Sequence, residues 1–229
     1  TWADAKTGSA RTFDRAKAEG IRKSAGGQLK LTEVKRKTKK TFSPALYDLT
    51  SLQREANARY GYSAKMTLNI MQRLYETHKL LTYPRTDSRY LTTDMVGTLK
   101  ERLKACAAGP YRKTASKLSM QEIHGDKSFV NNAKVSDHHA IIPTEQFVQL
   151  EKLSNDERKI YDMVVRRFLA VLSPACEYEE ITLSGMIGNE TFRAKTQAVI
   201  NPGWRNVYKD SWQDINEDDY DSDDDFISS

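Results

Sequence analysis

Residues 154–174 constrain the fold of this chain more than any other stretch. They begin with a Ser-x-x-Glu capping box, Ser154 and Glu157, in which each side chain satisfies a free backbone N–H at the start of a helix. Pro174 stops the pattern because proline cannot continue a helix. Seven apolar residues recur between them at helical spacing: Ile160, Tyr161, Val164, Val165, Phe168, Leu169 and Leu172. An apolar face this wide must be buried, so we expect this helix deep in the core of a helical domain.

The hydrophobic period changes from helical to alternating on both sides of the helical region. Residues 29–41 alternate roughly between apolar and polar, which predicts an exposed strand pair or a strand with a basic loop. Residues 178–200 form two alternating runs around a Gly188-Asn189 hairpin turn. Strands therefore flank the helices, and the sequence predicts an α+β fold in which a helical domain is inserted into a β domain.

These changes of period also give domain boundaries. We expect residues 1–49 to form the first part of the β domain, residues 50–173 the helical domain and residues 174–209 the returning strands. Residues 210–229 carry nine acidic residues and no lysine or arginine. Such a segment cannot bury enough apolar surface to fold, so we expect a disordered tail or an interrupted loop.

Several helix starts can be assigned from capping residues. Thr50 and Gln53 fit a capping box, and Ser63 fits the cap of the next helix, which leads into residues 80–91. Near the start of the chain, Thr12 fits the cap of a short helix over residues 13–23.

The composition favours a globular protein that binds a polyanion. The chain is 38% hydrophobic and 29% charged and has no apolar run long enough to span a bilayer, so no membrane association is expected. Outside residues 210–229, 36 Lys and Arg face 22 Asp and Glu, an excess of 14. A basic body with an acidic tail indicates nucleic acid as the partner. The alternative is a basic surface that is merely solvated.

The cysteines and the first residue give two further expectations. Cys106 and Cys176 lie far apart and form no Cys-x-x-Cys pair, which fits a reducing cytoplasm and excludes a zinc ribbon. The chain starts at Thr1 and shows no signal peptide, so we expect a segment excised from a longer polypeptide.

Residues 80–91 carry the groups best suited to chemistry. Pro84 keeps Tyr83 out of the helical region, and an extended chain places Tyr83, Arg85 and Asp87 on one face. A guanidinium can neutralise the non-bridging oxygens of a phosphodiester while a phenol attacks its phosphorus. The alternative is a helix-stop turn with a packed tyrosine and a solvated arginine.

The pair His138-His139 has three interpretations: a metal site, a catalytic group or a packed structural pair. A metal site would need two more ligands, and only Asp137 is close. In an extended chain the two rings point to opposite faces, so at most one can face residues 80–91. His78 and His124 are expected to be ordinary surface or packing residues.

Two stretches together resemble a known family. Residues 83–88, with residues 73–78 before them, resemble the active-site segment of type IA DNA topoisomerases, nearest to the bacterial topoisomerase III branch. Residues 136–144 resemble that family's active-site histidine segment. The similarity covers roughly residues 42–208.

The resemblance implies a fold, an activity and site residues. The fold would be a mainly helical, winged-helix-like domain that carries the catalytic tyrosine and is inserted into a partial antiparallel β arch domain. Tyr83 would attack one DNA strand and form a 5′-phosphotyrosine link, in an enzyme that relaxes or decatenates DNA. Arg85 would contact the scissile phosphate, and His138 would hydrogen-bond that phosphate or aid proton movement. His139 would be structural.

Four neighbours of these residues are expected to contact the DNA backbone or to support the catalytic side chains: Thr86, Asp87, Ser88 and Arg89. Asp87 has two open interpretations, since it can orient Arg85 or cap the turn with Ser88.

The chain departs from the family in one respect. Type IA enzymes also have a Toprim domain, whose Glu and Asp residues hold Mg²⁺, and nothing in this sequence resembles it. We expect no metal ligands here and interpret the Asp-x-Asp pairs of Asp219, Asp221 and Asp223 as solvated acid. The chain alone is therefore expected to be inactive, with single-stranded DNA and the Toprim domain of the same polypeptide as partners. The alternatives are a non-catalytic single-stranded DNA-binding module and a structural domain in which Tyr-Pro-Arg is only a turn.

Overall fold

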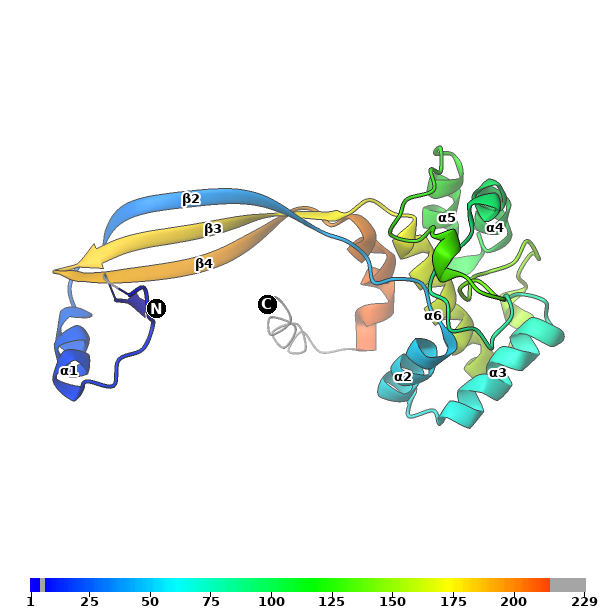
Figure 1. Cartoon of the computed structure of the whole chain (residues 1–229), viewed down its shortest axis with the longest axis horizontal. Helices are drawn as coiled ribbons and strands as arrows, with labels where there is room; N and C mark the ends of the chain where they lie inside the picture. The colour runs from blue at the N-terminus through cyan, green and yellow to red at the C-terminus, as the bar shows by residue number, and fades with distance from the viewer. Residues whose placement is uncertain (5–6, 215–229) are drawn as a thin grey trace. The chain divides into compact units, whose positions relative to one another are not determined.

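The computed structural model describes residues 1–4 and 7–214, and the chain divides into two compact units. One unit consists of residues 1–41 and 176–202 and contains an antiparallel sheet of four strands. The other consists of residues 42–175 and the residues from 203 onward, and it is mainly helical (Figure 1). The chain thus has a mixed α and β fold. No helix in the described part of the chain is long and apolar enough to cross a membrane.

The sheet has the strand order β1-β4-β3-β2. Its strands are β1 (Trp2–Ala3), β2 (Lys30–Thr41), β3 (Cys176–Ile187) and β4 (Glu190–Asn201). Gly188 adopts a φ of +59° between β3 and β4, a conformation that glycine reaches without steric cost. The hairpin predicted at Gly188-Asn189 is confirmed.

Residues 29–41 resolve into one continuous strand rather than a strand pair or a strand with a basic loop. Strand β2 pairs with β3 along its length, and its cations face the acidic residues of β3. Arg36 lies 2.8 Å from Glu179, and Lys39 lies 2.7 Å from Glu180. Cross-strand pairs of opposite charge favour one register over its neighbours, which explains why so polar a stretch forms a strand.

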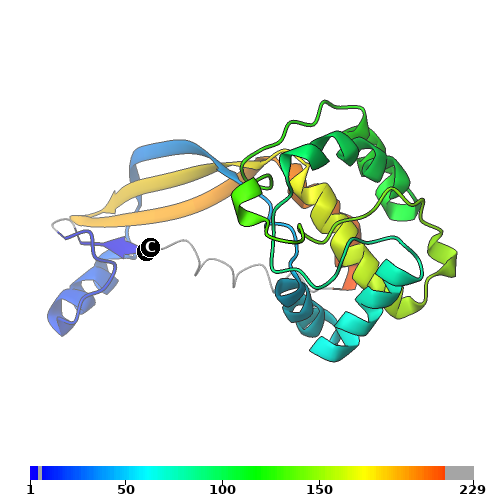
Figure 2. The same cartoon turned by 45° about the vertical axis from the view of Figure 1, so that its right-hand side comes forward.

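The helical unit is built around α6 (Asn155–Val171). Ser154 Oγ accepts a hydrogen bond from Glu157 N at 3.3 Å, and the Glu157 carboxylate accepts one from Ser154 N at 2.9 Å. The predicted capping box is therefore confirmed. Tyr161 and Phe168 are fully buried within the core. The helices of this unit lie around α6 in both views (Figures 1 and 2).

The remaining helical segments belong to the helical unit, except for α1 (Arg15–Ser24), which lies in the sheet-containing unit. The other α-helices are α2 (Leu49–Tyr60), α3 (Ala64–Glu76), α4 (Leu99–Ala105) and α5 (Arg112–Ser119). The 3₁₀ segments are η1 (Thr93–Thr98), η2 (Gly109–Tyr111), η3 (Asn132–Lys134), η4 (Leu150–Lys152) and η5 (Gly203–Asp214).

The caps of α1 and α2 differ from the predicted ones. Asp48 accepts a hydrogen bond from Ser51 N at 2.6 Å and caps α2, whereas Gln53 donates to the carbonyl of Ala64. Asp14 rather than Thr12 caps α1. In both cases an aspartate beside the predicted residue makes the capping bond. Ser63 caps α3 as predicted.

The segment after β4 is a helix where the sequence predicted returning strand up to residue 209 and then a tail. Segment η5 begins at Gly203 and runs to Asp214. Val207 and Tyr208 are buried in the helical unit, and Arg166 donates a 2.5 Å hydrogen bond to the carbonyl of Val207. Burial of these two side chains holds the chain in a helix. Residues 215–229, which include the predicted acidic Asp-x-Asp pairs, lie outside the described residues.

Candidate active site

The predicted catalytic segment lies beside the predicted histidine segment. Thr82 N donates to the carbonyl of Ile142 at 3.0 Å, and the Thr82 hydroxyl donates to the carbonyl of Ala140 at 3.2 Å. Four residues further on, the Thr86 hydroxyl donates to the carbonyl of His138 at 2.9 Å. Two stretches that are more than 50 residues apart in sequence are thereby fixed next to each other.

Burial alternates along the catalytic segment, as it does in an extended chain with one face on the core. Pro84, Thr86 and Ser88 are buried, whereas Arg85 and Asp87 between them are exposed. The guanidinium and the carboxylate therefore lie on the solvent side of the segment.

Tyr83 and His138 are brought together by this arrangement. Their ring centroids are 4.2 Å apart with an angle of 35° between the ring planes. Tyr83 is half-buried and His138 is exposed, so solvent reaches the pair. Such a stack places an imidazole, which can take or give a proton near neutral pH, against a phenol.

Tyr75 on α3 completes the surroundings of Tyr83. Its ring meets the Tyr83 ring edge to face, with centroids 5.6 Å apart and an angle of 82°, a favoured aromatic geometry. Sequence reasoning missed this residue. The only signal was its place in residues 73–78, because the contact depends on how the chain turns back after α3.

Arg85 is exposed and has no hydrogen-bond or ion-pair partner within residues 1–4 and 7–214. Asp87 is also exposed, and over the same part of the chain it makes neither an ion pair with Arg85 nor a capping bond with Ser88. Neither predicted role of Asp87 is therefore seen. A guanidinium that is not committed to a protein carboxylate is available to an external anion.

Four residues were predicted to contact DNA or to support the catalytic side chains. Three of them donate hydrogen bonds to backbone carbonyls. Thr86 holds the carbonyl of His138, and Ser88 donates to the carbonyl of Lys134 at 2.8 Å. Arg89 Nε donates to the carbonyl of Leu46 at 3.1 Å. The Thr86 bond fixes the backbone that carries the ring of His138, and the other two hold the catalytic segment to residues 134 and 46.

The two histidines differ in their surroundings. His139 is half-buried, and its Nδ1 lies 2.7 Å from the carbonyl oxygen of Ala140. Burial lowers the pKa of His139, and the hydrogen bond to Ala140 only partly offsets this. Of the pair, His138 is the one whose ring contacts Tyr83.

Other tyrosines of the helical unit are poorly suited to attack a substrate. Tyr47, Tyr111 and Tyr161 are buried, and burial raises the pKa of each phenol. Burial and a hydrogen bond to Asp156 raise the pKa of Tyr62 to about 12. Tyr83 differs from these four because it is partly exposed beside a histidine and an uncommitted arginine.

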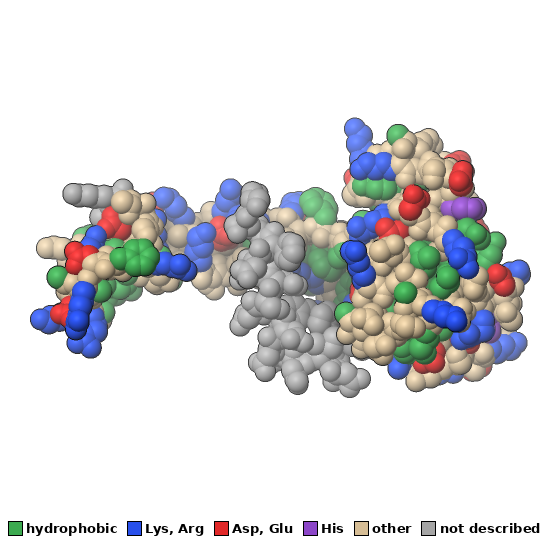
Figure 3. All heavy atoms as spheres, turned by 60° about the horizontal axis from the view of Figure 1, so that its bottom comes forward, with side chains coloured by type: hydrophobic (Ala, Val, Ile, Leu, Met, Phe, Trp, Pro, Cys, Tyr) green, Lys and Arg blue, Asp and Glu red, His purple; other side chains and the backbone are tan. Residues whose placement is uncertain are grey.

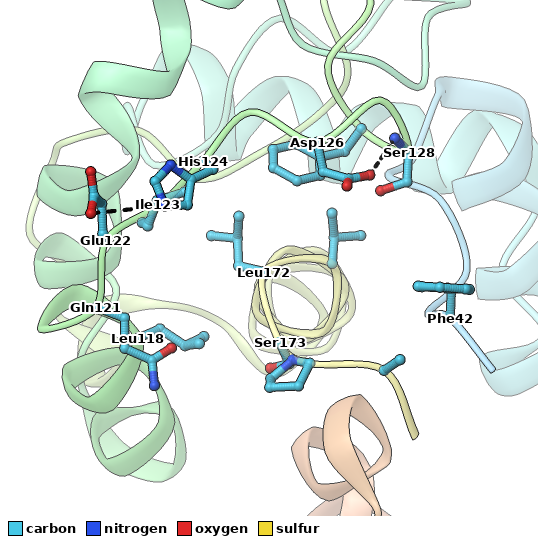
Figure 4. Close-up of a pocket in the computed structure, with 14 residues that line it drawn as sticks. Phe42, Leu118, Gln121, Glu122, Ile123, His124, Asp126, Ser128, Leu172 and Ser173 are labelled. Atoms are coloured by element: carbon cyan, nitrogen blue, oxygen red, sulfur yellow. Dashed lines mark hydrogen bonds and ion pairs between the residues drawn. The ribbon is translucent and has the colours of Figure 1, made fainter. Parts of the chain in front are cut away.

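A separate cavity of about 330 Å³ opens at the C-terminal end of α6. Leu172 points into it, and His124 and Glu122 lie on its rim, 3.8 Å apart (Figure 4). Asp126 accepts a 2.7 Å hydrogen bond from Ser128 N at the opposite side. The lining contains no tyrosine, cysteine, lysine or arginine, so this cavity offers neither a phenol or thiol nucleophile nor a fixed cation.

No three Asp, Glu, His or Cys side chains come together as metal ligands anywhere in residues 1–4 and 7–214. Mg²⁺ takes carboxylate oxygens as its protein ligands, and the described residues do not fit such a site. Lysine and arginine side chains are spread over the visible faces of both units rather than gathered in one patch (Figure 3).

Comparison with known proteins gives concordant matches. A family model described as DNA topoisomerase matches residues 1–226. The DNA topoisomerase 3 of Bacillus cereus is 56% identical over 215 residues, which is 93% of this chain and 29% of that protein. The DNA topoisomerase 3 of Bacillus subtilis is 50% identical over 220 residues, which is 96% of this chain and 30% of that protein. The chain thus spans less than a third of these relatives.

A solved structure shares the fold. Full-length topoisomerase I from Thermotoga maritima is 26% identical, with a TM-score of 0.62, and the match covers 90% of this chain and 33% of that one.

Proposed function

Because the chain belongs to the DNA topoisomerase family, we propose that it supplies the tyrosine with which a type IA enzyme cleaves and rejoins one DNA strand. The observation that carries this proposal is the contact between the rings of Tyr83 and His138, with the exposed and uncommitted Arg85 two residues after Tyr83 in the same segment. The names of the relatives support DNA as the substrate.

In the proposed reaction the phenol oxygen of Tyr83 attacks the phosphorus of a backbone phosphodiester. A bond forms between this oxygen and phosphorus, and the bond from phosphorus to the deoxyribose 3′ oxygen breaks. The 3′ oxygen leaves with a proton, and the phosphate remains attached to Tyr83 as a 5′-phosphotyrosine ester. Attack by the same 3′ hydroxyl reverses the step, reseals the strand and restores the phenol.

Arg85 and His138 would assist different parts of this step. The planar guanidinium of Arg85 can bind two non-bridging phosphate oxygens at once and offset their charge as the phosphorus is attacked. His138 can donate a hydrogen bond to the phosphate or move a proton beside the phenol. Thr86 acts through His138, because its hydroxyl holds the carbonyl of that residue.

A complete reaction would need groups from outside this chain. A family enzyme uses Mg²⁺, and we place the ion on the carboxylates of a Toprim domain in the same polypeptide, since the described residues do not offer such a site. That domain and single-stranded DNA are the proposed partners, and the outcome would be relaxation or decatenation of DNA in the cytoplasm.

The same reasoning extends to the architecture. We propose that the helical unit is the winged-helix-like catalytic-tyrosine domain and that the four-stranded sheet is part of the β arch domain. Because the chain spans less than a third of its curated relatives, the segment alone should be inactive.

The test compares the polypeptide that carries this chain with its Tyr83→Phe variant. Both are incubated with labelled single-stranded DNA and Mg²⁺, denatured, and examined for DNA that stays attached to protein. The unsubstituted protein should form the adduct and Tyr83→Phe should not, while both bind DNA equally. Binding without any adduct in either protein would favour a non-catalytic DNA-binding module. An adduct on Tyr83→Phe would refute the assignment.

A further inference from the structure

A second cavity of the helical unit, of about 270 Å³, lies where the catalytic segment begins. Its lining combines an aromatic ring, two amides, an imidazole and an ammonium group, contributed by Phe147, Gln146, Gln149, His78 and Lys152. No carboxylate lines it. This groove, called the Phe147 groove below, is therefore neutral to basic and partly aromatic.

Phe147 is 68% exposed, so most of its ring faces solvent. The backbone on either side of it is anchored. Gln146 N donates to the Thr144 hydroxyl at 3.2 Å, and Val148 N donates to the carbonyl of Ala105 at 3.2 Å. Val148 itself is buried. The ring is thus held in solvent by a fixed backbone and is a preorganised surface for stacking.

The polar side chains around the ring are uncommitted. Within residues 1–4 and 7–214, the side chains of Gln146, Gln149 and Lys152 have no hydrogen-bond or ion-pair partner. An amide can pair with the edge of a nucleobase, and an ammonium group can neutralise a phosphate. Stacking on an aromatic ring supplies affinity for any base, because every base has a π face.

The groove is attached to the same backbone that carries Tyr83. Thr144 N donates to the carbonyl of Leu80 at 3.0 Å, and the Thr144 hydroxyl donates to the carbonyl of Lys79 at 2.5 Å. Leu80, which lines the groove, precedes Tyr83 by three residues. Three extended residues span roughly 10 Å, which corresponds to roughly three stacked nucleotides at about 3.4 Å each.

We propose that the Phe147 groove binds one unpaired base of single-stranded DNA, with the base stacked on Phe147, its edge at Gln146 or Gln149 and the adjoining phosphate at Lys152. This inference rests on the proposed function, because it takes DNA as the substrate and Tyr83 as the residue that attacks a phosphate of the bound strand. The groove would hold the strand a few nucleotides from the phosphate that is cleaved.

The experiment measures binding of a short labelled single-stranded oligonucleotide to the 229-residue chain by fluorescence anisotropy. Phe147→Leu should weaken binding about tenfold, since stacking on an aromatic ring is worth about 1–3 kcal/mol per base. Phe13→Leu is the matched control, because Phe13 is likewise an exposed phenylalanine but lies in the sheet-containing unit; it should leave affinity unchanged. Lys152→Gln should lower the salt dependence by about one phosphate contact.

A second readout reports stacking directly. An oligonucleotide series with 2-aminopurine at successive positions should show fluorescence quenching at one register, and Phe147→Leu should abolish it. Equal affinity and equal quenching for Phe147→Leu and Phe13→Leu would overturn the proposal, as would no binding by the unsubstituted chain. If Phe147→Leu weakened binding to duplex DNA as much as binding to single-stranded DNA, the proposal would also be overturned, because a paired base cannot enter the groove. Covalent attachment at Tyr83 is measured separately, so either proposal can fail while the other stands.

Discussion

Glu157 joins the start of α6 to α3, and its charge should contribute strongly to the stability of the helical unit. Its carboxylate is buried and lies 2.8 Å from Arg73 Nε and 3.5 Å from His78 Nε2. Burial alone would raise the pKa of Glu157, but hydrogen bonds from Arg73 and Ser154 outweigh this and lower the pKa from 4.5 to about 2. A fall of this size corresponds to about 3 kcal/mol of folding free energy at neutral pH.

The substitution Glu157→Gln removes the charge and keeps the oxygen that accepts from Ser154 N. We expect it to lower the free energy of unfolding by about 3 kcal/mol at neutral pH. Because the folded pKa is below the unfolded one, the stabilisation is present above the unfolded pKa and is lost as pH falls through the folded pKa. The difference between the two proteins should therefore shrink to about 1 kcal/mol near pH 3.

The assay is urea unfolding followed by far-UV circular dichroism, repeated between about pH 6 and about pH 3, the range over which the linkage is expected. Glu151→Gln is the matched control, since Glu151 is exposed just before α6, and it should be as stable as the unsubstituted chain throughout. If Glu157→Gln and the unsubstituted chain lost stability in parallel as the pH fell, the buried charge would not be the source of the stability.

Three further predictions concern strain, a buried cation and the histidine pair. Lys79 has a φ of +57°, a backbone conformation that is strained for residues other than glycine. Lys79→Gly should therefore raise the free energy of unfolding by about 0.5–1 kcal/mol in urea titrations. A lower free energy of unfolding for this variant would show that the strain is absent. Arg167 is buried, lies 2.6 Å from Glu55 and donates to the carbonyl of Ala45 at 2.9 Å. Arg167→Met should cost about 1.5–3 kcal/mol by the same assay, because it removes these charge-assisted hydrogen bonds while Glu55 keeps its ion pair with Arg59; a cost near zero would contradict this. In the complete polypeptide His138→Ala should slow DNA cleavage more than His139→Ala, and the reverse order would mean that the wrong histidine had been assigned.

The parts of the fold that the sequence predicted well are those set by local signals. The capping box of Ser154 and Glu157 and the apolar face of α6 lie within one helix, and the Gly188-Asn189 turn needs only its own backbone. These features depend little on the rest of the chain.

Elements whose limits depend on distant contacts could not be predicted in the same way. The cap of α2 was predicted at Thr50 but is Asp48, and the hydrogen bond from Leu49 N to the carbonyl of Thr86 at 3.0 Å ties this end of the helix to the catalytic segment. The strands were predicted to continue to residue 209, but segment η5 is held by burial of Val207 and Tyr208 against the helical core.

In the candidate site, too, local features were predicted and long-range contacts were not. An extended face that carries Tyr83, Arg85 and Asp87 followed from Pro84 alone, and alternating burial agrees with it. The edge contact of Tyr75 with Tyr83 and the double hydrogen bond of Thr82 to the histidine segment were not predicted. Both depend on how segments far apart in sequence pack against each other.

If Tyr83 is the nucleophile, it becomes covalently linked to DNA, and peptide mapping of the trapped adduct identifies the linked residue. Trypsin cuts after Arg73, Lys79 and Arg85, so Tyr75, Tyr83 and Tyr90 fall in different peptides. After nuclease digestion, mass spectrometry should find the added nucleotide on the peptide of residues 80–85, joined to Tyr83 through a 5′ phosphate. An added nucleotide on the peptide that holds Tyr75 or Tyr90, with residues 80–85 unmodified, would show that Tyr83 is not the nucleophile.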